Sequence, residues 1–164
     1  MLFNLSPMGK SKKRSAGLLP YRFRDGRLEV FIAHMGGPFW AATDDRGWSI
    51  VKGEYEEPED PLDAARREFK EETGNDPPEG TMLELGEIRQ RSGKRVTAWA
   101  VAGDIDPATV SSNTFTLEWP PRSGRQQEFP EIDRAAWFDL DAAKTKLREE
   151  QVPLIERLEL LVGG

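Results

Sequence analysis

The stretch from residue 53 to residue 75, GEYEEPEDPLDAARREFKEETGN, concentrates carboxylates. Between residues 54 and 72, nine acidic residues stand against three basic ones, a local charge of −6 that equals the net charge of the whole chain. Glu68, Glu71 and Glu72 are spaced i, i+3 and i+4, so on a helix they share one face. Like charges at this spacing each cost a helix roughly 0.2 to 0.5 kcal/mol. The cluster therefore favours a bound cation, with a solvated acidic helix face as the alternative.

The chemistry of the donors narrows the choice of cation. Carboxylate oxygens with no Cys or His nearby are typical ligands of Mg²⁺ or Mn²⁺, and the spacing of a Ca²⁺-binding loop is absent from the sequence. We therefore expect Mg²⁺ or Mn²⁺ as the cofactor.

The same stretch carries strong signals for a helix over residues 61–73. Asp60 is a typical N-cap, Pro61 suits the first helical position, and Gly74 suits the left-handed position after the last turn. An apolar face at helical spacing is expected to pack inward, and it consists of Leu62, Ala65 and Phe69.

These residues resemble the signature of the Nudix hydrolases: Gly, five residues, Glu, seven residues, Arg-Glu, apolar, any, Glu-Glu, any, Gly, aliphatic. The matching positions are Gly53, Glu59, Arg67, Glu68, Phe69, Glu71, Glu72 and Gly74. Asn75 departs from the pattern, since it replaces the final aliphatic residue. The resemblance implies a Nudix-type α/β/α sandwich, with a mixed β-sheet and a catalytic loop-helix-loop.

The resemblance also implies roles for the residues of the signature. Glu68, Glu71 and Glu72 would be metal ligands or the base that activates water, and the Gly53 carbonyl would be a further ligand. Arg67 would complete the catalytic set by pairing with Glu59 and orienting the helix. Many Nudix enzymes add a carboxylate from outside the signature, and the candidates for it here are Glu128 and Glu131.

Candidate substrate-binding residues lie outside the signature, and for each one an ordinary surface or core role is the alternative. Basic side chains that suit polyphosphate are Lys52, Arg91, Lys94, Arg122 and Arg125. Aromatic side chains that suit stacking on a base are Phe115 and Trp119. His34, the only histidine, is interpreted as a hydrogen-bonded residue at a strand end and not as the general base.

Other elements must position these residues. Residues 15–36 predict two strands joined at Asp25-Gly26, with Pro20 at an edge or a bulge. Further strands are expected over 48–54, 82–90, 95–103 and 135–140. Residues 103–130 lack a regular pattern and are predicted to form a loop that determines specificity.

Two helices are expected near the carboxyl end. The first starts at Asp139 or Asp141 and continues to residue 147, and the second follows over residues 151–163. The second helix is predicted to bury a stripe of Val152, Ile155, Leu158 and Leu161.

Length and composition set wider limits. We expect one domain over residues 15–164 behind a flexible basic tail over residues 1–14. The chain has no cysteine and no apolar run of the ~20 residues that cross a bilayer, so we expect a cytoplasmic protein without a membrane partner. Outside the acidic stretch the charge is near neutral, so no stable nucleic-acid partner is expected. Monomer and homodimer both remain open.

The resemblance to the Nudix hydrolases implies metal-dependent hydrolysis of a pyrophosphate linkage in a nucleoside diphosphate linked to a further group. A dinucleoside polyphosphate is the first expected substrate, after the similar Trp-Ser-Ile-Pro-Lys-Gly approach in some diadenosine polyphosphate hydrolases, and a nucleoside triphosphate is the second. Here Val51 occupies the proline position. The alternative is a Nudix module that binds and senses a nucleotide without cleaving it.

Overall fold

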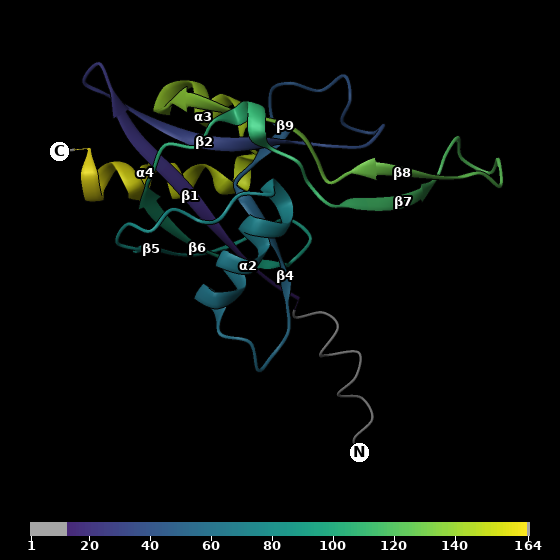
Figure 1. Cartoon of the computed structure of the whole chain (residues 1–164), viewed down its shortest axis with the longest axis horizontal. Helices are drawn as coiled ribbons and strands as arrows, with labels where there is room; N and C mark the ends of the chain where they lie inside the picture. The colour runs from purple at the N-terminus through teal and green to yellow at the C-terminus, as the bar shows by residue number, and fades with distance from the viewer. Residues whose placement is uncertain (1–12, 164) are drawn as a thin grey trace.

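The computed structural model describes residues 13–163 and shows a mixed sheet between helices (Figure 1). Within these residues, the strands of the main sheet are β1 (Arg14–Arg24), β2 (Arg27–Met35), β3 (Trp48–Ser49), β4 (Val51–Tyr55), β5 (Leu83–Arg89), β6 (Arg95–Ala102) and β9 (Ile132–Asp139). Most of the predicted basic tail, residues 1–12, lies outside the described residues. Its last residue, Arg14, is the first residue of β1.

Strand β1 is the centre of the sheet, because it is paired along both sides. It runs parallel to β6 on one side and antiparallel to β4 and β2 on the other. The predicted hairpin is confirmed: Asp25 and Gly26 join β1 to β2 at positive φ (52° and 78°). Pro20 lies where β1 changes partner from β4 to β2. The predicted edge position of Pro20 is therefore wrong.

The divergence of β1 and β2 makes room for the segment that carries the acidic stretch. These two strands pair only as far as Tyr21 and Val30. Beyond that point β4 lies on β1 and β3 lies on β2. Gly17 permits the close approach of β4, since a side chain there would come within 2.7 Å of the Lys52 Cβ atom. Strand β4 therefore lies in the middle of the sheet and continues directly into the acidic stretch.

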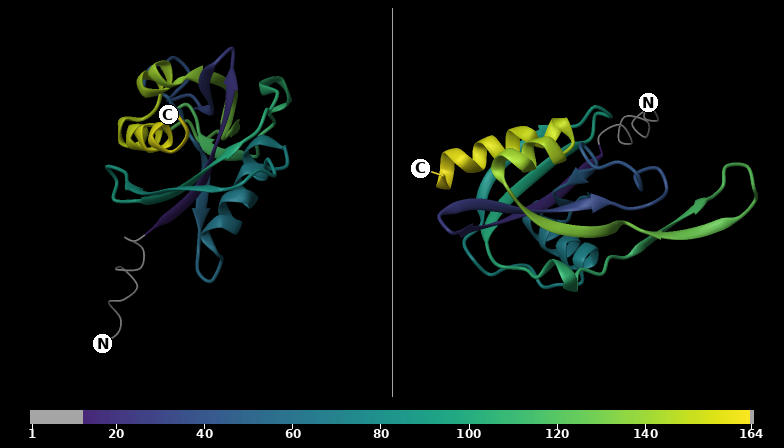
Figure 2. Two further views of the ribbon diagram at one scale, coloured as in Figure 1. Left: turned by 90° about the vertical axis from the view of Figure 1, so that its left-hand side faces the viewer. Right: turned by 90° about the horizontal axis from the view of Figure 1, so that it is seen from above.

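Helices cover both faces of the sheet (Figure 2). The described elements are α2 (Pro61–Thr73), α3 (Leu140–Lys146) and α4 (Val152–Val162), with 3₁₀ turns η1 (Pro107–Thr109) and η2 (Glu149–Gln151). Helix α2 buries Ala65 and Phe69 against Leu18 and Phe31 on one face. On the other face, α3 and α4 pack on β2, β5 and β9. The predicted α/β/α sandwich is confirmed. No helix among residues 13–163 is long and apolar enough to cross a membrane.

The region from 103 to 130 is more regular than the sequence indicated. Strands β7 (Thr114–Glu118) and β8 (Gln126–Pro130) form a separate two-stranded hairpin that projects from the domain (Figures 1 and 2). Phe115 faces Phe129 across this hairpin, with ring centroids 6.0 Å apart. The prediction of an irregular loop over this whole region is therefore wrong, because cross-strand pairing organises much of it.

The two carboxyl-terminal helices follow the prediction with one correction. Asp139 caps α3 by accepting a hydrogen bond from the Ala142 N–H (2.8 Å). In α4, Ile155 and Leu158 are buried as predicted, but Val152 is only half-buried and Leu161 is 54% exposed, and Leu154 is buried instead. The buried stripe runs through the first turns of α4 and leaves the sheet before Leu161.

This burial pattern predicts different costs for two leucine truncations in α4. Leu158→Ala removes a fully buried side chain and should lower the free energy of unfolding by about 2 to 5 kcal/mol. Leu161→Ala is the matched control, and it should change that free energy by less than about 1 kcal/mol. Urea denaturation of both variants measures the difference, and equal destabilisation would contradict the burial assigned here.

Candidate active site

The acidic helix begins and ends where the capping residues predict. Both the Leu62 and Asp63 N–H groups donate to the Asp60 carboxylate, at 3.1 and 3.2 Å. Gly74 adopts a left-handed conformation (φ 74°), and its N–H donates to the Lys70 carbonyl. The predicted span of residues 61–73 is confirmed, so the spacing of the carboxylates is the helical spacing assumed from the sequence.

Arg67 ties this helix to the loop that precedes it. Its Nε and Nη2 atoms donate to the two oxygens of Glu59, at 2.8 and 2.9 Å. Its Nη1 atom donates to Glu68 at 2.8 Å and to Glu71 at 3.2 Å. These carboxylates, Glu59 first, hold the pKa of Arg67 above its ordinary value. One guanidinium therefore fixes the loop and two helix carboxylates together.

The helix carboxylates line a cavity of about 440 Å³ at the place where β1 and β2 diverge. Its charged lining and the glycine beside it are Lys52, Gly53, Glu54, Glu68, Glu71, Glu72, Lys94 and Glu131. Glu131 comes from the connection between β8 and β9, and thus enters the cavity from a distant part of the chain. Besides Glu54, the fold thus brings three glutamates of α2 and Glu131 to one cavity.

The cavity carboxylates are short of compensating charge. Burial, followed by the charges of Glu131, Glu68 and Glu71, raises the pKa of Glu72 to about 8. Burial also raises the pKa of Glu68, although the bond from Arg67 opposes this, and it raises the pKa of Glu131. A group whose pKa lies near 8 is largely protonated at neutral pH. A positive charge in the cavity would displace that proton.

The residues suit a hard divalent cation in their chemistry, but they are not yet arranged around one. Among residues 13–163, no three His, Asp or Glu side chains already have metal-ligand spacing, and Glu68 is held by Arg67. Gly53 has no side chain, and a Cβ atom there would collide with the Glu68 carboxylate. Because residue 53 is a glycine, the Glu68 carboxylate can lie directly against its backbone. The donor set fits Mg²⁺ or Mn²⁺ once Glu68 turns from Arg67.

Two lysines complete the lining. Lys94 pairs with Glu54 at 2.7 Å, and that pairing lowers the pKa of Glu54. Lys52 lies two residues before Glu54 on β4, so both side chains lie on the same side of the strand. Burial, and then the charges of Lys94 and Arg148, lower the pKa of Lys52 to about 8. Lys52 and Lys94 are therefore placed to meet an anionic ligand in the cavity.

Several predicted residues lie outside this cavity. Arg122 stands in the turn between β7 and β8, and Arg125 stands just before β8. Trp119 packs edge-on against Phe39 (centroids 5.3 Å apart), and Phe115 packs against Phe129.

Glu128 and Arg91 also lie apart from the carboxylates. Glu128 is exposed within β8. Arg91 lines another hollow, of about 270 Å³, together with Trp40, Arg46, Arg148, Glu149 and Glu150. Metal binding by Glu128 and substrate binding by Arg91 stay predictions, as do the substrate contacts predicted for the residues of the β7–β8 hairpin.

The structure adds residues that sequence reasoning missed. The polar side chains Ser15, Ser49 and Asn113 also line the cavity. No local motif marks them. Ser15 and Ser49 reach the site through the pairing of β1 with β4 and of β2 with β3, and Asn113 is held there by backbone hydrogen bonds to Glu71 and Glu131. His34 is fully buried and shares hydrogen bonds with Asp133 (2.8 Å) and the Thr43 carbonyl (2.6 Å). This agrees with its structural interpretation.

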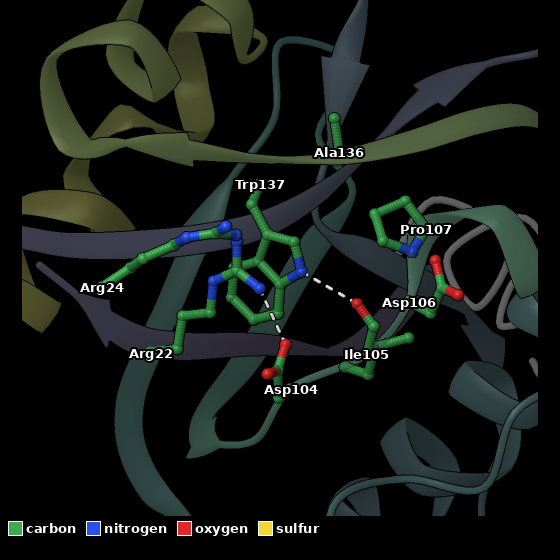
Figure 3. A pocket seen from close by; sticks show the side chains of 8 residues that line it. All are labelled: Arg22, Arg24, Asp104, Ile105, Asp106, Pro107, Ala136 and Trp137. Atoms are coloured by element: carbon green, nitrogen blue, oxygen red, sulfur yellow. Dashed lines mark hydrogen bonds and ion pairs between the residues drawn. The ribbon is translucent and has the colours of Figure 1, made fainter.

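A second hollow, of about 530 Å³, lies toward the other end of β1 (Figure 3). The Arg22 guanidinium lies 4.2 Å from the centroid of the Trp137 ring and donates to Asp104 at 2.7 Å. The Trp137 indole N–H donates to the Ile105 carbonyl at 2.9 Å. Two carboxylates line this hollow, Asp104 and Asp106, whereas five glutamates line the cavity beside α2. The space with convergent carboxylates is the candidate active site.

Known proteins share this fold. The NUDIX domain family matches residues 12–158. An Ap4A hydrolase from C. elegans, solved as a binary complex, has a TM-score of 0.65 and 22% identity, covering 93% of this chain and 98% of that chain. The NUDIX domain of Shewanella oneidensis NrtR, complexed with ADP ribose, has a TM-score of 0.63 and 16% identity, covering 92% and 88%. A MutT protein from Methanosarcina mazei has a TM-score of 0.58 and 17% identity, covering 92% and 94%.

No curated protein sequence matches the chain. The family match nevertheless extends over most of its length, so the chain belongs to the Nudix family. The prediction from the signature residues is confirmed at this level, and family membership supports the predicted pyrophosphohydrolase class.

The Arg67 contacts predict that this residue stabilises the fold. Arg67→Ala removes the two bonds to Glu59 and leaves three carboxylates without their cation, so the melting temperature should fall by several degrees. Arg66→Ala is the matched control, because Arg66 is exposed and its Asp63 partner is 4.0 Å away. Thermal unfolding followed by circular dichroism measures both variants. Equal melting temperatures for the two would show that the Arg67 pairs do not hold the loop.

Proposed function

We propose that this chain hydrolyses the pyrophosphate linkage of a nucleoside diphosphate joined to a further group, with Mg²⁺ or Mn²⁺ as cofactor. The observation that carries the proposal is the single cavity in which Glu68, Glu72 and Glu131 face Lys52 and Lys94. Carboxylates suit the cation and lysines suit the phosphates that such a reaction needs in one place.

The glutamates and the lysines of the cavity have different roles in this proposal. Glu68, Glu71, Glu72 and the Gly53 carbonyl would hold the cation, which when bound neutralises phosphate charge and acidifies a water. Lys52 and Lys94 bind the phosphate chain and orient it toward the carboxylates. A cavity glutamate that has lost its own proton to the bound cation takes the proton from the attacking water. Glu68, Glu72 and Glu131 are the candidates, since burial raises the pKa of each of them.

For the substrate, a dinucleoside polyphosphate is our first choice and a nucleoside triphosphate the second. The Ap4A hydrolase from C. elegans supports the first choice through its similarity over 93% of this chain. The cavity volume of about 440 Å³ suits a flexible phosphate chain, and its two lysines suit several phosphates. A cytoplasmic location and the absence of a stable nucleic-acid partner remain predictions.

A module that binds a nucleotide without cleaving it is the second candidate. The Arg67 bond to Glu68 favours it, since it occupies one oxygen of a carboxylate that would otherwise be free to bind the metal. The similarity to the NrtR domain complexed with ADP ribose also supports it. Hydrolysis is preferred, because every glutamate of the signature is present.

Turnover separates the two candidates. The protein should hydrolyse at least one nucleotide of a panel of dinucleoside polyphosphates, nucleoside triphosphates and ADP ribose in MgCl₂, and excess chelator should abolish this activity. Glu72→Gln keeps the volume of the side chain but removes a charge, so kcat should fall by about 100-fold or more. Products are resolved by ion-exchange chromatography. Binding of a panel member without products would establish the sensing module instead.

The placement of the basic residues predicts which of them affect substrate binding. Lys94→Ala should raise KM about tenfold, because it removes a charge from the cavity. The double variant Arg122→Ala, Arg125→Ala tests the sequence prediction that these arginines bind phosphate. From their place in the turn between β7 and β8, outside the cavity, we now expect it to leave KM within twofold. Steady-state kinetics on the best substrate compares the variants. A larger effect from the double variant would show that the hairpin reaches the substrate.

A further inference from the structure

The Ser15 hydroxyl is the one buried side-chain polar atom of residues 13–163 that has no hydrogen-bond partner. Ser15 is 1% exposed, and it lines the cavity that contains the carboxylates. A buried hydroxyl without a partner destabilises the fold, because it has lost its hydration and gained no hydrogen bond in exchange. Such a group in a candidate active site calls for an explanation through a ligand.

The strand register places this hydroxyl among the lysines. Ser15 pairs with Glu54 in the antiparallel ladder of β1 and β4, and residues directly opposite one another share a face of the sheet. Lys52 is two residues before Glu54 and therefore lies on the same face. Glu54 is bonded to Lys94 at 2.7 Å. The hydroxyl thus lies on the face that carries Lys52 and Lys94, and the direct ion pair of Glu54 on that face is with Lys94.

The carboxylates approach from the other face. Gly53 pairs with Ala16, whose side chain packs in the core beneath α2, and the Glu68 carboxylate lies against Gly53. Strand β4 therefore separates a carboxylate side of the cavity from a lysine side. A polyphosphate chain that spans the cavity would therefore have some of its phosphates at the carboxylate side and the others at the lysine side.

We propose that Ser15 is a substrate-binding residue, whose hydroxyl donates a hydrogen bond to a phosphate oxygen on the lysine side of the cavity. This inference rests on the proposed function for the identity of the ligand. Phosphate oxygens are strong hydrogen-bond acceptors. A hydroxyl on the face of the lysines would orient a phosphate group by a directional hydrogen bond, which the ammonium groups, acting as point charges, do less well. The site would select ligands whose phosphate chain continues beyond the carboxylates.

The test uses inorganic tripolyphosphate as a probe of the lysine side. Its Kd in MgCl₂ is measured by isothermal titration calorimetry for the unaltered protein and for Ser15→Ala. The variant should bind about tenfold more weakly, the change expected from the loss of one hydrogen bond to a charged acceptor. Its melting temperature should be level or higher, since an unpartnered hydroxyl has been removed.

A matched hydroxyl deletion separates binding from folding. The Thr73 hydroxyl is also buried, but it already donates to the Phe69 carbonyl at 2.7 Å. Thr73→Val should therefore lower the melting temperature and leave the Kd of tripolyphosphate unchanged. This is the opposite of the pattern expected for Ser15→Ala.

The outcomes distinguish this inference from the proposed function. If the protein hydrolyses nucleotides and Ser15→Ala changes neither Kd nor KM, the hydroxyl has no role in binding and the inference is wrong. The inference is equally wrong if the unaltered protein does not bind tripolyphosphate. If binding depends on Ser15 but no nucleotide is cleaved, the phosphate site stands and the hydrolytic function falls.

Discussion

The site depends on the burial of several carboxylates around one space, with a single arginine to compensate them. Arg67 binds Glu59 through two hydrogen bonds and reaches Glu68 and Glu71 with its remaining nitrogen. Glu72 receives none of these bonds, and its pKa rises to about 8. Repulsion in a space of low dielectric is costly unless a charge of opposite sign enters. Without a cation, Glu72 is therefore expected to be largely protonated at neutral pH, and a cation that bound in the cavity would replace this proton.

The rest of the fold keeps this arrangement in place. Because β1 and β2 diverge, β4 enters the centre of the sheet and brings Lys52 and Gly53 to opposite faces of one strand. The caps at Asp60 and Gly74 fix where α2 begins and ends, and hence which carboxylates share its inner face. Phe69 anchors the helix in the core beside Phe31 (ring centroids 6.5 Å apart). Strand pairing, helix capping and core packing therefore hold the carboxylates together although they repel one another.

Local signals in the sequence predicted the local parts of this structure. Capping residues located α2, and Asp-Gly located the first hairpin. Properties that depend on distant pairing could not be read in this way. Neither the partner change at Pro20 nor the position of Ser15 opposite Glu54 follows from a local pattern. The sequence also gave little reason to choose Glu131 over Glu128, because the choice depends on where β8 ends and the chain returns to the sheet.

The central claim is that a divalent cation replaces the bond between Arg67 and Glu68 as the compensation for the buried carboxylates. A crystal of the protein soaked in MnCl₂, with anomalous scattering data, tests it most directly. We predict an anomalous peak between the carboxylates of α2 and the Gly53 carbonyl, with Glu68 turned away from Arg67. A cavity without manganese at saturating MnCl₂, in which Glu68 still accepts from Arg67, would contradict the account.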